Sequence, residues 1–256
     1  MNIKEQLKTD LYKLGICKGD VLLMHSSYKS LGFVEGGAFT VFEALKETIG
    51  EEGTLILPAL SFNNVTREQS FFDRELTPVC IGYLPEYFRT QVTGVVRSLH
   101  ATHSCCAWGK YAEEIIKNHE KDITPVGKNS PFAKLPQYNG KILMLGCNRD
   151  RNTSMHGVEE SIDPIPNYCI DFDNPVVYTL KDKDKTIEVK SYRHNFVNKD
   201  GGCIGQCYSK IIGLLKKNEV SHGYVLEADC TLMDAKALWK RGRSKMLQDP
   251  LYFVEY

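Results

Sequence analysis

The features that assign many sequences to a class are missing from this chain. Its 256 residues include 32 basic and 32 acidic side chains, so the formal net charge is zero. A neutral balance offers no general attraction to nucleic acid or to an anionic membrane. No segment approaches the roughly 18 consecutive apolar residues that a membrane span needs. The first residues, MNIKEQLKTDLYKLGI, have the pattern of an amphipathic helix that contains acids, unlike a secretory signal. We therefore expect a protein that binds neither nucleic acid nor membranes.

Motifs for catalysis and cofactor binding are also scarce. The chain has no G-x-S-x-G elbow, no P-loop and no G-x-G-x-x-G fingerprint. A serine hydrolase is therefore disfavoured, and nothing around Cys105 marks an activated thiol, which disfavours cysteine catalysis. Nine cysteines occur at irregular spacing without a C-x-x-C pair. This pattern is typical of free thiols in a reducing compartment, so we expect a cytoplasmic protein.

The hydrophobic pattern predicts an α/β fold. Residues 3–14 and 38–49 have helical spacing, whereas GDVLLMHSS and GTLILPAL have the pattern of buried strands, so the first 60 residues contain a βαβ unit. Residues 61–78 have no period and predict an irregular loop. Further helices are predicted over 82–91, 110–120, 152–162, 203–218 and 233–247. Extended segments are predicted over 95–109 and 140–147, and antiparallel strands over 174–180, 185–192 and 222–229. We expect one domain, residues 1–256, with a central mixed sheet flanked by helices.

The segment HSSYKSLGFVEGGA, which begins at His25, joins the first predicted strand to a helix. Glycines at positions 32, 36 and 37 let a ligand approach the backbone, and the N–H groups at a helix N-terminus favour a phosphate. An ordinary strand-to-helix turn is the alternative.

Two further segments concentrate polar residues. In VVRSLHATHSCCAWG, Arg97 suits an anionic partner or a surface salt bridge. His100 and His103 lack the companion ligands that a zinc site requires, so we expect no metal. In NTSMHGVEESI, His156 and Glu159 are three residues apart and share a helix face. A carboxylate there orients an imidazole as a general base, although the histidine could also cap or pack the helix.

Taken together, four ordered blocks of the chain resemble the aminoglycoside 3-N-acetyltransferase family, also called the antibiotic N-acetyltransferase family. These blocks are LLMHSSYKSLGFVEGGA, RSLHATHSCCAWG, GKNSPFAKL and ILMLGCNRDRNTSMHGVEE. Ala101 replaces the proline of the family's H-P-T-H-S block, and Cys105 and Cys106 replace its usual aromatic or small pair. These departures affect packing more than chemistry. The resemblance covers nearly the whole chain.

The resemblance implies a single α/β domain that differs from the GNAT acetyltransferases, and transfer of an acetyl group from acetyl-coenzyme A to an amine. It implies that His156 takes the proton of the amine, that Glu159 orients it, and that His25 and His103 line the thioester. Backbone N–H groups, or a hydroxyl such as that of Thr102 or Ser104, would stabilise the oxyanion. The implied coenzyme A site comprises His25, Ser26, Ser27, Lys29, Ser30, Leu31, Gly32, Val34, Gly36, Gly37, Arg97, Ser98, Thr102, His103 and Ser104.

The acceptor is less well defined. The segments 61–78 and 163–173 are expected to face it, and acids there would attract a polycation or lie in solvated loops. We expect Asp73, Glu160 and Asp163 to contact the acceptor, an aminoglycoside or related amino sugar. The alternatives are an amino-sugar N-acetyltransferase of surface-glycan biosynthesis, a coenzyme A-binding protein without turnover, and a hydrolase that uses activated water. A homodimer is left open.

Overall fold

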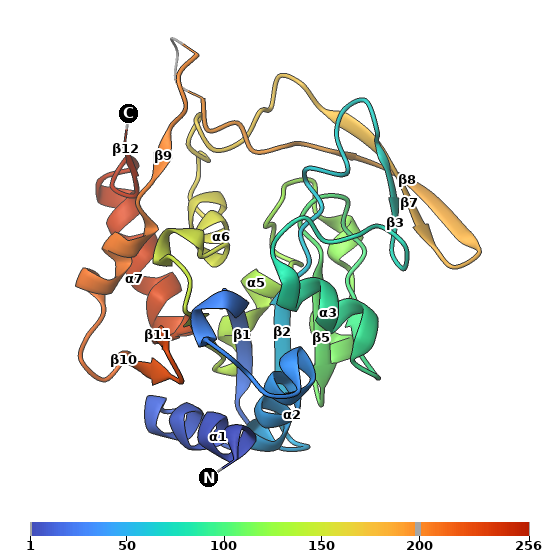
Figure 1. Cartoon of the computed structure of the whole chain (residues 1–256). Helices are drawn as coiled ribbons and strands as arrows, with labels where there is room; N and C mark the ends of the chain where they lie inside the picture. Colours follow the sequence, from blue (N-terminus) through green and yellow to red (C-terminus); the bar gives the residue numbers. More distant parts are fainter. Residues whose placement is uncertain (1, 198–200, 256) are drawn as a thin grey trace.

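The computed structural model describes residues 2–197 and 201–255, and Figure 1 shows them as helices packed around a central twisted sheet. Seven strands form that sheet. Their order across it is β10 (Val220–Val225), β11 (Ala228–Asp234), β6 (Lys141–Leu145), β1 (Val21–Ser26), β2 (Thr54–Pro58), β5 (Cys105–Gly109) and β4 (Val96–Arg97). The strands β6, β1 and β2 are parallel, and their neighbours on both sides are antiparallel. The predicted mixed sheet is confirmed.

The first βαβ unit forms as the sequence indicates. Helix α1 (Ile3–Leu14) begins where the Asn2 side chain accepts the Glu5 N–H, and it ends at Gly15 in the left-handed conformation. Helix α2 (Gly37–Ile49) connects β1 to β2, which pair in parallel with Leu22 opposite Leu55. A parallel pair needs such a crossover.

Alternate residues of each central strand point to opposite faces and build two cores. Leu22 and Met24 of β1 pack with α1, α2 and α3 (Tyr83–Gln91) on one face. Val21 and Leu23 pack on the other face. There they meet four helices, α4 (Ala112–Ile116), α5 (Pro131–Lys134), α6 (Ser154–Glu160) and α7 (Ala235–Gln248). The result is a three-layer α/β/α arrangement.

Two smaller sheets lie outside this arrangement. Strands β3 (Phe71–Asp73), β7 (Val176–Asp182) and β8 (Lys185–Ser191) form a three-stranded sheet at the side of the molecule (Figure 1). Strands β9 (Gly205–Gln206) and β12 (Val254–Glu255) form a short antiparallel pair near the C-terminus. The antiparallel pairing of 174–180 with 185–192 is confirmed, although it is separate from the central sheet.

Four local predictions need correction. The irregular segment 61–78 contains the short strand β3, which pairs with β7 far along the chain. Residues 222–229 include a turn, where Leu226 has a φ of 49°, so they belong to both β10 and β11. Residues 203–218 form β9 and a 3₁₀ helix, η5 (Tyr208–Leu214), in place of an α-helix. The helix predicted over 110–120 is only five residues long, and a 3₁₀ turn, η2 (His119–Lys121), follows it.

Other 3₁₀ turns connect the main elements. These are η1 (Tyr28–Leu31), η3 (Leu135–Tyr138) and η4 (Arg149–Arg151). Within the described residues, no helix is long and apolar enough to cross a membrane. All nine cysteines are free thiols.

Candidate active site

The parallel strands place several predicted residues at one edge of the sheet. The carboxyl ends of β1, β2 and β6 meet there, because parallel strands share a direction. In open α/β sheets this edge is the usual location of a ligand site. A cavity of about 330 Å³ lies at this edge. Its lining residues are Leu60, Phe62, Ile81, Thr102, His103, Arg151, Thr153, His156, Arg193, His194, Phe196 and Gln206.

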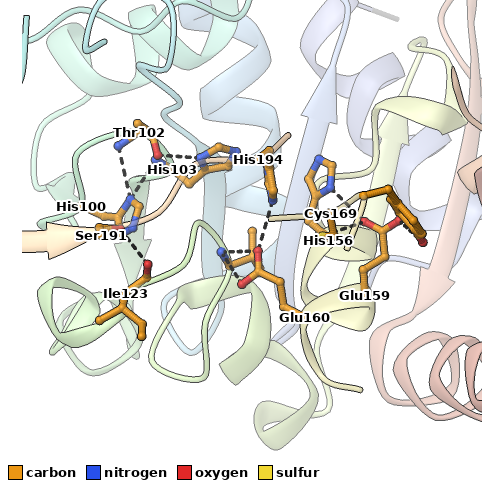
Figure 2. A network of polar contacts seen from close by, with 12 residues as sticks. His100, Thr102, His103, Ile123, His156, Glu159, Glu160, Cys169, Ser191 and His194 are labelled. Atoms are coloured by element: carbon orange, nitrogen blue, oxygen red, sulfur yellow. Dashed lines mark hydrogen bonds and ion pairs between the residues drawn. The ribbon is translucent and has the colours of Figure 1, made fainter. Parts of the chain in front are cut away.

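His156 is the lining residue with the most elaborate support. It lies in the first turn of α6, after the loop that follows β6. Its Nδ1 is 3.2 Å from Glu159 Oε2 and 2.8 Å from the Tyr208 hydroxyl. The Tyr208 hydroxyl in turn donates to Glu159 Oε2 at 2.7 Å. Since Nδ1 faces these groups, Nε2 is the nitrogen that remains for a proton from outside. The contact expected from the spacing of His156 and Glu159 is therefore present (Figure 2).

Glu159 is completely buried behind His156. The Tyr168 hydroxyl lies 3.3 Å from its Oε1, and the Cys169 thiol lies 3.8 Å from its Oε2. Burial, and then the neighbouring Glu159 carboxylate, raise the pKa of Tyr208 well above its ordinary value. Tyr208 therefore stays a hydrogen-bond donor at neutral pH. A buried carboxylate surrounded by donors can stabilise an imidazolium beside it.

A second histidine–carboxylate pair adjoins the first. His194 Nε2 lies 3.2 Å from Glu160 Oε1, and the Val126 N–H donates to both oxygens of that carboxylate. The rings of His194 and His156 are 4.2 Å apart, and those of His194 and His103 are 4.9 Å apart. Figure 2 shows His194 between the other two rings, with Glu160 below it. Three histidines from three separate segments thus form one wall of the cavity.

The protonation states of this second pair follow from burial. Burial raises the pKa of Glu160 to about 8. Burial, and then the charge of His156, lower the pKa of His194 and of His103 well below their ordinary value. At neutral pH, both rings are therefore neutral and Glu160 is mostly protonated.

Thr102 and His103 lie where the sequence places them, on the cavity wall. His103 Nδ1 is 2.9 Å from Thr102 Oγ1, and the His103 N–H donates to His100 Nδ1 at 3.0 Å. These contacts fix the tight turn between β4 and β5. His100 lies behind that wall and does not line the cavity.

His25 lies at the carboxyl end of β1, beneath this site. Its side chain is buried, and burial, followed by the charge of His156, lowers its pKa to about 3. His25 Nε2 and the adjacent Ser26 Oγ are buried without a hydrogen-bond partner in the described structure. Such atoms mark a place where polar ligand atoms fit. The residues present therefore suit the thioester end of a coenzyme.

The loop after β1 is partly a structural device. Ser30 Oγ lies 2.7 Å from the Gly146 carbonyl and 2.9 Å from Ser27 Oγ, so these hydroxyls tie the loop to β6. Helix α2 then begins after Gly36, which has a φ of 78° and provides no side-chain cap. The Gly37 N–H donates to the Val34 carbonyl, whereas no side chain of the described residues caps the N-terminus of this 13-residue helix, and an anion site requires such uncapped N–H groups.

Arg97, Ser98 and Ser104 do not reach the cavity. The buried Arg97 guanidinium donates to Ser104 Oγ and to the carbonyls of Ala59 and Thr77. Ser98 Oγ contacts His119 Nδ1 and accepts the Cys105 N–H. These three residues hold the β4–β5 region together, and their expected contact with coenzyme A stays a prediction.

The three acids expected at the acceptor also lie elsewhere. Asp73 is buried in the small sheet and pairs with Lys181 at 3.0 Å. Asp163 is exposed beyond α6, and Glu160 lies behind His194 rather than on the cavity surface. From the loop that begins at residue 61, Phe62 does line the cavity. The negative charge of these residues does not predict where they lie, because the residues that they contact are distant in sequence.

Sequence reasoning missed several lining and supporting residues, notably Arg151, Arg193, His194, Phe196 and Tyr208. Arg151 lies within the fourth sequence block, where nothing distinguishes it from its neighbours, and the other four belong to no local motif, so their only signal is residue type. A larger groove of about 720 Å³ runs beside α4 and β8, but no histidine lines it. The described residues contain no group of three or more histidine, cysteine and acidic side chains that could hold a metal ion.

The protein has an α/β/α fold with a buried histidine–carboxylate site at the carboxyl edge of its sheet, an arrangement typical of an enzyme. Comparisons with known proteins identify its family. The sequence profile of the aminoglycoside 3-N-acetyltransferase family matches residues 23–247. The chain belongs to this family of acyltransferases, as its four sequence blocks indicate.

Individual proteins with names from this family are also similar to the chain. An SPbeta prophage-derived aminoglycoside N(3')-acetyltransferase-like protein of Bacillus subtilis is 32% identical over 179 residues, which cover 62% of this chain and 65% of that protein. The chain thus spans about two thirds of the length of this relative. Aminoglycoside N(3)-acetyltransferase IV of a Salmonella species is 29% identical over 260 residues, which cover 98% of this chain and 90% of that enzyme.

Solved structures share the fold. A binary complex of AAC-IIIb with CoASH superposes with a TM-score of 0.81 at 25% identity, covering 96% of both chains. A histidine-to-alanine mutant of AAC(3)-IVa in complex with a gentamicin gives a TM-score of 0.80 at 26% identity, covering 98% of this chain and 90% of that one. The fold is therefore that of these acetyltransferases, and not a GNAT fold.

Proposed function

We propose that the chain transfers an acetyl group from acetyl-coenzyme A to an amino group of an aminoglycoside or related amino sugar. The observation that carries this proposal is His156, whose Nδ1 is held by Glu159 and Tyr208 while its ring lines the cavity. Family membership supports the reaction class, and the complex of AAC-IIIb with CoASH supports the donor.

In this proposal His156 is the general base. A sugar ammonium must lose a proton before its nitrogen can form a bond, and Nε2 of His156 is the acceptor that the contacts leave free. Glu159 then stabilises the imidazolium, and Tyr208 keeps the carboxylate in place. The donor supplies a thioester carbonyl, whose C–S bond breaks as the amide C–N bond forms.

The other residues of the site position the donor. His25 Nε2 and Ser26 Oγ are the unsatisfied polar atoms near the thioester end, and the loop to Gly37 with the start of α2 would bind the pantetheine and pyrophosphate. Of the two hydroxyls expected to stabilise the oxyanion, only Thr102 lines the cavity. Ser104 instead donates to the Ala59 carbonyl.

The test is the variant His156→Ala, assayed by release of the coenzyme A thiol in the presence of amine acceptors. We expect kcat to fall by about 10²–10⁴-fold, the usual contribution of a general base, while calorimetry shows coenzyme A binding unchanged. The matched control is His222→Ala, because His222 is an exposed histidine of β10 that contacts Thr231.

Three results would contradict the proposal in distinct ways. Unchanged turnover in His156→Ala would remove His156 from the role of base. Coenzyme A binding by the wild type without turnover of any amine would favour a non-catalytic binding protein. Steady thioester cleavage without an acceptor would favour a hydrolase.

A further inference from the structure

The charges around the cavity do not suit a polycation. The twelve described residues that line the cavity include two arginines, Arg151 and Arg193, and no carboxylate. Glu159 lies behind His156 and Glu160 lies behind His194, each hydrogen-bonded to its histidine. Burial raises the pKa of Glu160 to about 8, so it gives little negative charge at neutral pH. An acceptor with several ammonium groups would therefore face a cavity wall that carries two guanidinium cations and several imidazole rings.

The two arginines differ in what they can offer. The Arg193 guanidinium donates to the carbonyls of Val65 and Phe62 and lies 3.1 Å from the Tyr178 hydroxyl, so it mainly holds the wall in place. Arg151 is exposed and makes no hydrogen bond or ion pair through its side chain in the described structure. By contrast its neighbour Arg149 pairs with Asp229 at 2.8 Å. Arg151 is thus a free guanidinium at the cavity, with donors suited to phosphate or carboxylate.

The volume of the cavity also favours an acceptor smaller than a typical polycationic aminoglycoside. Its volume of about 330 Å³ is at the lower end of small-molecule sites. Such a space suits a single sugar ring with one reactive amine better than several linked amino sugars.

We propose that the acceptor is a small amino sugar that carries an anionic group, which Arg151 binds while the amine faces His156. This inference rests on the proposed N-acetyl transfer and narrows its substrate class. The anion could be a phosphate ester, the diphosphate of a nucleotide sugar or a carboxylate, because all three present oxygen atoms to a guanidinium.

The experiment compares acceptors that differ in charge. The coenzyme A thiol released with purified wild-type protein is measured with glucosamine, glucosamine 6-phosphate, muramic acid, a nucleoside-diphosphate-linked amino sugar and gentamicin. We expect kcat/KM to be at least about tenfold higher for one anionic sugar than for glucosamine, the scale of a charge-assisted hydrogen bond. The three anionic arms identify which anion is bound. Added salt should reduce the preference, because it screens an exposed charge.

The variant Arg151→Gln ties this preference to one side chain. We expect it to reduce kcat/KM for the anionic acceptor roughly tenfold, and to reduce the ratio to glucosamine by the same factor. Arg149→Gln, which removes the adjacent but paired arginine, should leave the ratio unchanged.

The possible failures are distinguishable. If gentamicin is the best acceptor, or if the anionic sugars show no advantage, this inference is overturned while the proposed acetyl transfer stands. If the advantage persists in Arg151→Gln, the assignment to Arg151 is overturned. If the wild type acetylates no amine at all, the proposed function itself fails.

Discussion

At the scale of single residues, the site depends on one buried carboxylate. Glu159 is fully buried, and an unpaired charge at such a position would be costly. The hydroxyls of Tyr208 and Tyr168 and the imidazole of His156 surround its oxygens. The same contacts that offset the burial of the charge also fix the imidazole, so the polar network both stabilises the protein and orients its candidate base.

The variants Tyr208→Phe and Tyr168→Phe separate these two effects. Each removes one hydroxyl near Glu159 and should destabilise the fold by about 1–2 kcal/mol. The Tyr208 hydroxyl also contacts His156 Nδ1, at 2.8 Å, whereas the Tyr168 hydroxyl donates to the Pro250 carbonyl at 3.0 Å. We therefore expect kcat to fall roughly tenfold in Tyr208→Phe, and clearly less in Tyr168→Phe. Urea unfolding and thiol release measure both quantities. Equal activity losses would show that the hydroxyl of Tyr208 does not position the base.

At the scale of elements, the position of α6 depends on its close approach to α7. Gly157 follows His156 directly, and a Cβ there would lie 2.4 Å from a ring carbon of Trp239 in α7 and 2.9 Å from a Val126 methyl. The glycine therefore lets α6 pack against both neighbours. Since α6 carries His156 and Glu159, this packing sets where the imidazole meets the cavity.

The variant Gly157→Ala tests this packing. Alanine normally favours a helix over glycine, by about 1 kcal/mol. Here overpacking should outweigh that gain and destabilise the fold by about 1–3 kcal/mol. The shift of α6 should also lower kcat. Gly213→Ala is the control, because nothing lies within 4 Å of a Cβ added there. A Gly157→Ala protein more stable than the wild type would contradict the packing argument.

At the scale of the whole molecule, the buried histidines couple stability to pH. Burial lowers the pKa of His25 to about 3 and of His100 to about 4. The pKa values of His103, His119 and His194 are also lowered well below the ordinary value, chiefly by burial. Glu160 shifts in the other direction, since burial raises its pKa to about 8. Folding therefore excludes protons from five imidazoles and retains one on a carboxyl group.

The pH dependence of stability follows from these signs. Below about pH 6.5, the imidazoles of the unfolded chain bind protons, whereas the buried imidazoles of the folded chain stay neutral. The free energy of unfolding therefore falls as the pH falls toward 4. Each imidazole alone accounts for about 2 kcal/mol by pH 5, and the five together outweigh the opposite effect of Glu160 in this range. Between pH 6.5 and 8, the proton that Glu160 retains lowers the stability by about 2 kcal/mol, which roughly cancels the remaining gain from the five imidazoles.

We therefore expect stability to rise steeply from pH 4 to 6.5 and to change little between pH 6.5 and 8, measured by urea unfolding across this range. In Glu160→Gln, stability should continue to rise between pH 6.5 and 8, by about 2 kcal/mol, because a neutral amide has no proton to release and only the imidazoles then act. The decline on the acid side should remain in this variant, because the imidazoles cause it. A wild-type protein whose stability is constant between pH 5 and 6.5 would contradict the buried neutral imidazoles.

Parts of the protein that depend on neighbours along the chain can be predicted from the amino-acid order. The unit from β1 through α2 to β2 follows from periodic hydrophobic residues, and the pairing of His156 with Glu159 follows from the pitch of a helix. The four sequence blocks also identified the family. That the chain is a single domain and cytoplasmic stays a prediction.

The distant residues that complete the site could be identified only once the chain was seen folded. Tyr208 and His194 reach His156 from other segments, and Arg97 donates to backbone carbonyls inside the protein. Their environments depend on how strands far apart in sequence pair and on which loops then cross the edge of the sheet. Side-chain type and local spacing do not reveal how these loops cross the sheet edge. The burial and the charge of the residues at the site depend on those crossings.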